Sequence, residues 1–356
     1  MEVMSDRLRC AVLGATGLVG QRFCQLLSGH PMFEEPDLYG SERSENERLR
    51  DRLKLADRPV SGGDLLEKEI KRLDTDVVIR EHYDAVFSAL PTEVAGQVES
   101  RLRNGGVTVF TNASPHRMDP DVPLVVPEVN PEHLRLASNR GGSIIANGNC
   151  STIGLVLTLA PSRPLRDREG ERGDNAGPLR RRLPWCAILD ALSNIVPYIK
   201  NEEEKLRAEP RKMLGRLKSG AIEPWDVEVS PFCTRVPVRR GHFEVVEVTF
   251  RRNRISRRSY RQWKASGGLP QEKRLPTAPE RPIIVRNEPD RPQPVLDVDA
   301  GSPDRARGMA VTVGRLSYGG RRLRYSLLVH NTIRGGLQAR LCYLPRPISR
   351  VVSDGT

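Results

Sequence analysis

The order of apolar and polar positions predicts a first region in which buried strands alternate with helices. Residues 8–13 form a short apolar run that ends in glycine, which indicates a buried strand. Apolar residues at helical spacing follow Gly20. Further strands are expected at residues 76–80, 85–89 and 107–111, with helical stretches such as residues 94–102 between them. Alternation of this kind is typical of a parallel α/β sheet.

The pattern changes after residue 150, where longer alternating strands are expected at residues 243–250, 309–313 and 325–329. These strands predict a mixed sheet in a second domain. The stretch 275–294 is rich in proline and arginine, and we expect an ordered loop there because apolar residues 283–285 interrupt it.

Two domains follow from this change of pattern. We expect residues 1–150 to form the first domain and residues 151–330 the second. Residues 331–341 have helical spacing, so residues 331–356 are expected to return and complete the first domain.

A glycine-rich turn, Gly14-Ala15-Thr16-Gly17-Leu18-Val19-Gly20, joins the first strand to the first helix. In a dinucleotide-binding fold, the first glycine permits a tight turn, the second lets backbone approach a pyrophosphate, and the third lets helix and strand pack closely. The N-terminus of the helix offers N–H groups to the phosphates. We therefore predict an α/β chain with an N-terminal Rossmann-like domain and an α+β domain that contains the mixed sheet.

Composition and charge exclude several function classes. The chain of 356 residues has a net charge of +12, yet acids are interleaved with the basic residues, and aromatic residues make up only 5%. Few aromatic side chains are therefore available to stack on nucleic-acid bases. We expect an anionic small-molecule substrate and cofactor and no nucleic acid. No apolar run spans a membrane and no secretion signal is evident, so no membrane partner and a cytoplasmic location are expected.

Cysteine usage points to one reactive thiol. The six cysteines include no CxxC pair, so neither a metal site nor a disulfide framework is predicted. Cys150 lies in the stretch NGNCSTIG, at a turn before an apolar helix, where the helix dipole lowers the pKa of a thiol and favours a nucleophilic thiolate. Cys10 and Cys24 are expected to be buried structural residues.

Two further stretches carry candidate chemistry. His242 ends the stretch TRVPVRRGH, and imidazole is the natural general base near neutral pH. Arg235, seven residues earlier, can hold a carboxylate with two parallel hydrogen bonds. Glu202 and Lys205 share one face of a predicted helix. Taken alone, a Gly-His pair more often lies in a turn than in an active site. A charged run on a helix is likewise more often a solvent-exposed face than a substrate-binding site.

Together the stretches resemble the aspartate-β-semialdehyde dehydrogenases of the archaeal and fungal branch. The resemblance runs in family order over nearly the whole chain, through GATGLVG, TNASPHR, MDPDVPLVVPEVNPEH, NGNCSTIG, EEEKLRAEPRKMLG, TRVPVRRGH, LPTAPERPIIV and GMAVTVGR.

The resemblance implies roles for individual residues. Cys150 would be the nucleophile, His242 the general base, and Asn149 a support beside the nucleophile. The implied substrate contacts are Arg235 with the α-carboxylate, Glu202 near the α-amino group, and Arg117 and Lys205 with phosphate.

The implied activity is the NADP-dependent reductive dephosphorylation of L-4-aspartyl phosphate to L-aspartate 4-semialdehyde, and its reverse, through a thioester on Cys150. It belongs to lysine, threonine and methionine biosynthesis. Backbone N–H groups at the helix start after Cys150 are expected to stabilise the oxyanion. The second domain of the family forms a dimer interface, which implies a homodimer or homotetramer.

The choice of NADP has its own signal after the predicted strand near residues 37–39. An NAD enzyme usually ends this strand in an acid, whereas an arginine suits a 2′-phosphate. Arg43 supplies the arginine; Glu42 is a contrary signal and is expected to point away. The cofactor-binding residues that we expect are Gly14, Thr16, Gly17, Leu18, Val19, Ser41, Arg43, Ser44 and Asn331.

One block departs from the family pattern. Where the family carries T-x-Q-A-x-S-G-x-G-Y-P-G-V, residues 174–186 read DNAGPLRRRLPWC. Arg181 to Cys186 can be encoded by codons that, read one base later, give Gly-Gly-Tyr-Pro-Gly-Val, and the same shift upstream allows the rest of the block. We interpret this as a pair of compensating frameshifts. The alternative is genuine divergence, in which case we expect residues 166–186 to form an irregular surface excursion.

Other functions stay open at this point. Malonyl-CoA reductase shares the scaffold, the nucleophile and the cofactor, although Arg235 and Glu202 favour an amino-acid substrate. N-acetylglutamyl-phosphate reductase is a more distant alternative. A non-catalytic cofactor-binding protein follows if the divergent block is real.

Overall fold

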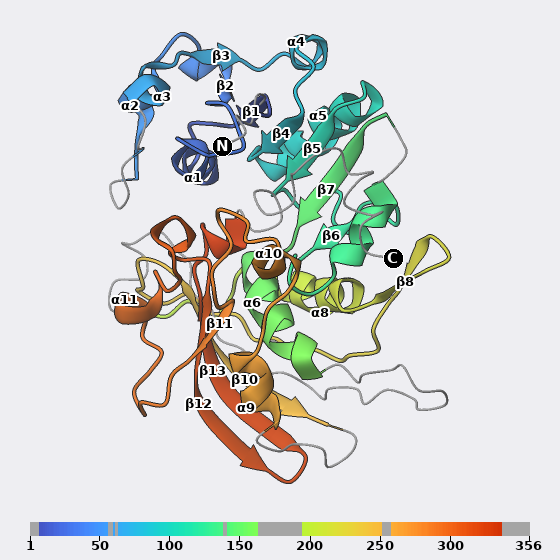
Figure 1. The fold of residues 1–356 in the computed structure, drawn as a ribbon, viewed down its shortest axis with the longest axis vertical. Coiled ribbons are helices and arrows are strands. Elements are labelled where there is room, and N and C mark those ends of the chain that lie inside the picture. The colour runs from blue at the N-terminus through green and yellow to red at the C-terminus, as the bar shows by residue number, and fades with distance from the viewer. Residues whose placement is uncertain are drawn as a thin grey trace, which may run out of the picture.

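The structure is a computed structural model that describes residues 7–55, 60, 63–137, 141–162, 194–250 and 258–336. The divergent block and the residues after 336 lie outside the described residues, so what we expect of them stays a prediction. In Figure 1 the first sheet lies in the upper part of the molecule and the second sheet in the lower part, with α6 (Cys150–Leu159) where the two parts meet.

A seven-stranded sheet forms the upper part, in the order β3-β2-β1-β4-β5-β7-β6. Every pairing in it is parallel. The strands are β1 (Cys10–Leu13), β2 (Asp37–Gly40), β3 (Ile70–Arg72), β4 (Ala85–Ser88), β5 (Thr108–Thr111), β6 (Leu124–Val125) and β7 (Ser143–Asn147). The helices between them are α1 (Leu18–Leu27), α2 (Leu49–Arg52), α3 (Gly63–Glu67), α4 (Thr75–Arg80) and α5 (Thr92–Asn104). The predicted parallel α/β sheet is confirmed.

Residues 76–80, which we predicted to be a strand, are part of helix α4. That prediction is wrong. The carboxylate of Asp74 accepts hydrogen bonds from the N–H groups of Asp76 and Val77, and this cap starts the helix. Within the helix only Val78 is fully buried. A strand inside a parallel sheet would bury both faces, so one buried residue suits a helix on the surface of the sheet.

The glycine turn after β1 has the geometry that its spacing predicts. Gly14 has φ +77°, and a Cβ there would lie 2.8 Å from the carbonyl oxygen of Ala89. A Cβ on Gly20 would overlap the carbonyl oxygen of Gly14. Helix α1 therefore packs directly against the turn, at the point where the strand order passes from β1 to β4. In open α/β sheets, ligands bind at such a switch point.

The lower part holds a four-stranded sheet in the order β10-β13-β12-β11. Its strands are β10 (His242–Thr249), β11 (Ile283–Val285), β12 (Val311–Gly319) and β13 (Arg322–Val329). The pairs β10–β13 and β12–β13 are antiparallel and β11–β12 is parallel, so the predicted mixed sheet is confirmed. Residues 283–285, which we expected in a loop, form the edge strand β11, because three consecutive β-branched residues suit a sheet edge.

The other described elements surround these sheets. They are α8 (Glu202–Met213), the hairpin β8 (Arg216–Lys218) and β9 (Ala221–Glu223), α9 (Arg258–Lys264), α10 (Leu269–Glu272) and α11 (Pro294–Asp297). Short 3₁₀ turns lie at Glu42–Ser44, Pro131–Ala137, Ala160–Ser162 and Asp304–Ala306. None of the helices in the described part of the chain has both the length and the apolar character needed to cross a membrane.

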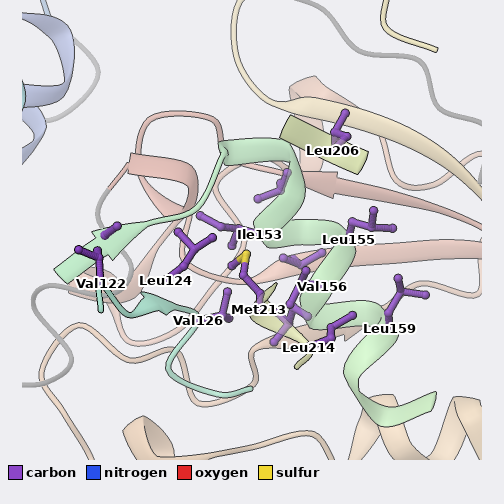
Figure 2. Close-up of a cluster of buried hydrophobic side chains, with 14 of the residues drawn as sticks. Val122, Leu124, Val126, Ile153, Leu155, Val156, Leu159, Leu206, Met213 and Leu214 are labelled. Carbon is purple, nitrogen blue, oxygen red and sulfur yellow. The ribbon is translucent and has the colours of Figure 1, made fainter. Parts of the chain in front are cut away.

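Helix α6 is buried on all sides, which fixes its N-terminus in space. Residues 151–159 are all buried. Figure 2 shows Ile153, Val156 and Leu159 of this helix among apolar side chains from the region of β6 and from α8. A helix that is apolar around its whole circumference belongs in a core. Any residue at its first turn is therefore held rigidly.

Gly20→Ala should destabilise the fold, because the new Cβ overlaps the backbone of Gly14. We expect the free energy of unfolding, measured by urea denaturation, to fall by about 1–3 kcal/mol, as for overpacking in a core. Gly17→Ala is the matched control, since a Cβ there would meet only the Gly14 carbonyl oxygen at 3.4 Å. Equal losses in the two variants would contradict this account of the turn.

Candidate active site

Cys150 is the first residue of α6, and Asn149 caps this helix. Asn149 Oδ1 accepts hydrogen bonds from the N–H groups of Ser151 (3.0 Å) and Thr152 (3.2 Å). The N–H of Ile153 bonds to the Asn149 carbonyl oxygen (3.0 Å). The expectation that N–H groups after Cys150 stabilise an oxyanion is therefore wrong for these three residues, because the cap already uses them.

His242 faces the thiol from the start of β10. Its Nε2 lies 2.9 Å from Cys150 Sγ, and the side chain is buried. The preceding Gly241 has φ +92°, and its N–H donates to Asn331 Oδ1 (3.2 Å). An imidazole at this distance can take the proton of the thiol, so the pair has the geometry of a nucleophile and its general base.

Helix α8 places a carboxylate and an ammonium group beside the cap. Asn149 Nδ2 donates to Glu202 Oε1 (2.8 Å), and Lys205 Nζ lies 3.7 Å from Glu202 Oε2. Glu202 and Lys205 thus share one face of the helix, as their spacing predicts. Both belong to the residues that we expect to contact substrate.

A second carboxylate of α8, Glu209, joins Arg117 to the cap. Arg117 Nη1 donates to Glu209 Oε1 (2.8 Å), and the N–H of Asn149 donates to Glu209 Oε2 (2.6 Å). Arg117 Nη2 donates to the carbonyl oxygen of Asn112 (2.7 Å). Both Arg117 and Glu209 are buried. The guanidinium is therefore held in one orientation close to the start of α6.

Lys212, one turn further along α8, holds the segment that carries Arg117. Its Nζ donates to the carbonyl oxygens of Arg117 (2.8 Å), Asp119 (2.7 Å) and Val122 (2.8 Å). Burial lowers the pKa of Lys212 to about 8. The three carbonyl acceptors favour its charged form, which donates all of these hydrogen bonds at neutral pH.

Arg235 lies on the segment that leads to His242. Its backbone pairs with Val196 in an isolated bridge, with N–O distances of 2.7 and 3.1 Å. Among the residues that the structure describes, no carboxylate pairs with the Arg235 guanidinium. The side chain is half-buried and stays available for an external carboxylate.

The turn after β13 packs against the nucleophile. Asn147 Nδ2 donates to the carbonyl oxygen of Gly335 (2.8 Å) and to Asn112 Oδ1 (3.0 Å). A Cβ on Gly335 would overlap the Cβ of Cys150, and one on Gly336 would lie 3.6 Å from Val19 Cγ1. Residues 331–336 therefore contact both the segment that carries the thiol and the glycine turn.

The residues of the glycine turn fit a dinucleotide phosphate. Gly17 is the N-cap of α1, no side chain caps this helix, and its first turn contains no acid. The first N–H groups of a helix have no partner within the helix, so they are open to an anion. Leu18 is exposed and Val19 half-buried at the same turn, while the Thr16 carbonyl oxygen accepts from Gln21 Nε2 (3.0 Å).

The turn after β2 places the other expected cofactor residues. Ser44 is buried and its Oγ donates to the carbonyl oxygen of Ser41 (3.0 Å), which holds the turn. Arg43 is exposed between them. Glu42 lies beside Arg72, with 3.3 Å between its Oε1 and Nη1 of the arginine. No group of three or more potential metal ligands occurs in the described ranges.

The sequence matches family models of dehydrogenase domains, which is consistent with the nucleophile and the glycine turn described above. Residues 9–137 match the semialdehyde dehydrogenase NAD binding domain, and residues 186–334 match the semialdehyde dehydrogenase dimerisation domain. The chain is 43% identical to the aspartate-semialdehyde dehydrogenase of Archaeoglobus fulgidus, over 94% of this chain and 96% of that protein. The chain belongs to the aspartate-semialdehyde dehydrogenase family.

Two other proteins are similar to this chain over most of its length. A crystal structure of aspartate-semialdehyde dehydrogenase with NADP from Candida albicans superposes with a TM-score of 0.80 at 33% identity, over 98% of this chain and 99% of that chain. A malonyl CoA reductase (NADP) of Metallosphaera sedula is 32% identical over 93% of this chain and 94% of that protein.

Three residues of the site were missed by the sequence analysis: Glu209, Asn147 and Gly335. A signal existed for Glu209, which lies seven residues after Glu202 and hence on the same face of α8. Asn147 lies two residues before Asn149 in the stretch that we examined for its cysteine. No local pattern marks Gly335, because its neighbour Cys150 is remote along the chain.

Iodoacetamide should modify Cys150 before the other described cysteines. Cys10, Cys24 and Cys233 are buried, and burial raises the pKa of the Cys24 thiol to about 12, so its reactive thiolate is scarce at pH 7. Mass spectrometry of digested protein measures the order of labelling.

His242→Asn should slow the labelling of Cys150 about tenfold, the effect of one pKa unit on the thiolate fraction. His82→Asn is the control, because His82 is exposed and has φ 50°, which asparagine tolerates. Faster labelling of Cys24, or an unchanged rate in His242→Asn, would contradict the assignment.

Proposed function

We propose that this chain catalyses the NADP-dependent conversion of L-4-aspartyl phosphate to L-aspartate 4-semialdehyde and phosphate, and the reverse reaction. The observation that carries the proposal is the 2.9 Å contact between Cys150 Sγ and His242 Nε2 at the capped start of α6. A thiol with a base at hydrogen-bond distance and a helix N-terminus behind it is suited to attack an acyl phosphate.

The chain's residues account for the acyl-transfer half of the reaction. His242 takes the thiol proton, and the Cys150 thiolate attacks the acyl carbon. The new C–S bond replaces the C–O bond to phosphate, and the imidazolium returns its proton to the departing phosphate oxygen. NADPH, when bound at the glycine turn, supplies the hydride that reduces the resulting thioester. Release of the aldehyde restores the thiolate, which takes a proton from water.

The substrate contacts follow from the charges around the cap. Arg235 has a guanidinium available for the α-carboxylate, and Glu202 presents a carboxylate for the α-ammonium group. Lys205 and Arg117 are the cations for phosphate, and each is linked to Asn149 through a glutamate. We propose these substrate contacts. We also propose that NADP contacts the glycine turn, the residues Ser41, Arg43 and Ser44, and Asn331.

Two alternatives compete with this function. A malonyl-CoA reductase is favoured by the relative at 32% identity, but malonyl-CoA has no α-amino group for Glu202 to bind. A non-catalytic protein is favoured only if the divergence of residues 174–186 is genuine.

The wider organisation is also proposed. Residues 1–150, completed by residues 331–356, form the cofactor domain, and residues 151–330 form the catalytic and dimerisation domain. The match to a dimerisation domain supports a homodimer or a homotetramer. We place the protein in the cytoplasm, where aspartate-derived metabolites are made.

The test is reduction of NADP with three aldehydes: aspartate semialdehyde and N-acetylglutamate semialdehyde with phosphate as the acyl acceptor, and malonate semialdehyde with coenzyme A as the acyl acceptor. We expect turnover with the first only. Cys150→Ala should abolish it and leave NADP binding, measured by fluorescence, intact, because the thiol forms the covalent intermediate. Turnover in Cys150→Ala, or a preference for another aldehyde, would overturn the proposal.

The same assay on a variant that carries the family block at residues 174–186 separates the remaining alternative. We expect this variant to exceed the chain as given by orders of magnitude, since the block supplies a glutamine and glycines in place of three arginines. A new sequence of the gene across codons 155–190 decides between a frameshift and divergence.

Arg43→Ala should raise the KM for NADP about tenfold and leave that for NAD unchanged, because only NADP carries the 2′-phosphate. An arginine–phosphate hydrogen bond contributes roughly 1.5 kcal/mol at such an exposed position. Arg50→Ala is the control, since Arg50 is also exposed and pairs with Glu67 away from this turn. Equal effects on both cofactors would assign the specificity to other residues.

A further inference from the structure

Glu209 makes two hydrogen bonds that join separate parts of the site. One carboxylate oxygen accepts from Arg117 Nη1 at 2.8 Å, and the other accepts from the Asn149 N–H at 2.6 Å. The Glu209 side chain is 2% exposed, so water cannot take over either role. The position of the guanidinium relative to the residue before the nucleophile therefore depends on one carboxylate.

The contacts of Glu202 repeat this arrangement at the side chain of the capping residue. Glu202 binds the side chain of Asn149 and the ammonium group of Lys205, while Glu209 binds the backbone of Asn149 and the guanidinium of Arg117. The two glutamates are two helical turns apart on α8. Each of the two cations that we assign to phosphate is thus tied to the start of α6 through a glutamate.

Arg117 keeps donors for a ligand after these bonds are made. Each terminal nitrogen of a guanidinium carries two hydrogens, and the structure uses one from each, for Glu209 and for the Asn112 carbonyl oxygen. Lys212 fixes the backbone of the same segment through three carbonyl groups. The guanidinium is therefore held in one orientation, and one N–H group on each terminal nitrogen remains for a ligand such as phosphate, whose oxygens accept charge-assisted hydrogen bonds from arginine.

We infer that Glu209 is a positioning residue that orients Arg117 toward the phosphate beside Cys150. The inference rests on the proposed function only in naming the anion as phosphate. Glu209 acts through Arg117 and does not touch the substrate. A purely structural ion pair would stabilise the fold without affecting anion affinity, so affinity for phosphate is the property to measure.

The experiment measures protection of Cys150 from iodoacetamide by inorganic phosphate, without NADP or turnover. Phosphate bound between Arg117 and Lys205 blocks access to the thiol, and the concentration that halves the labelling rate reports its affinity. The amide of a glutamine at this position would have only one oxygen, whereas both carboxylate oxygens of Glu209 accept hydrogen bonds. In Glu209→Gln the NH₂ group must therefore face either Arg117 or the Asn149 N–H, and the hydrogen bond to that partner is lost. We expect the half-protecting phosphate concentration to rise about ten- to a hundredfold, as for loss of a charge-assisted contact.

Glu204→Gln is the matched control, because it removes the same charge from an exposed position of the same helix. It should change the half-protecting concentration less than twofold. Arg117→Lys keeps the charge that balances Glu209, and it should raise the half-protecting phosphate concentration as Glu209→Gln does. In the double variant the rise should be smaller than the product of the two single rises, because both substitutions remove the same oriented guanidinium.

The outcomes separate the inference from the proposed function. An unchanged phosphate affinity in Glu209→Gln, even with a lower melting temperature, overturns the inference and reduces Glu209 to a structural role. Absence of phosphate protection in the unaltered protein, or an additive double variant, overturns it as well. The proposed function fails by a different result, namely absence of NADP reduction with aspartate semialdehyde.

Discussion

The N-terminus of α6 is the constraint on which the rest of the site depends. A helix buried on all sides must satisfy its first N–H groups inside the protein, and Asn149 does this with its side chain and its carbonyl group. The cap in turn needs partners for its own amide and backbone N–H, which α8 supplies through Glu202 and Glu209. Each of these carboxylates then holds a cation. The charges that we assign to substrate binding thus follow from the burial of one helix end.

The same burial explains how distant parts of the chain meet at the thiol. Helix α6 packs against the region of β6 and against α8 (Figure 2), and it also contacts β13. The helix therefore lies where the upper and lower parts of the molecule meet (Figure 1). His242 begins the strand that pairs with β13, and its register is set along the whole length of that pairing. The distance between base and nucleophile is therefore fixed by sheet geometry and core packing and does not depend on a flexible loop.

What the sequence could predict depended on how local each feature is. The glycine turn and the cysteine at a helix start are written in a few adjacent residues, and both were predicted. The bond between Glu209 and Arg117 spans 92 residues and has no local pattern. The short apolar run at residues 76–80 suits either a strand or a helix, and the Asp74 cap decides for the helix. The N–H groups of Ser151 and Thr152 are not left for an oxyanion because the side chain of the capping residue accepts both.

The close packing of Gly335 on Cys150 has a consequence for synthesis of the protein. Gly335 follows Cys150 by 185 residues in the sequence, so the nucleophile and its cap are synthesised before the residue that packs against them. A nascent polypeptide therefore carries the thiol before Gly335 can cover one side of it. The contact between these two residues forms only after all the described strands of both sheets, which end with β13 at Val329, have been synthesised.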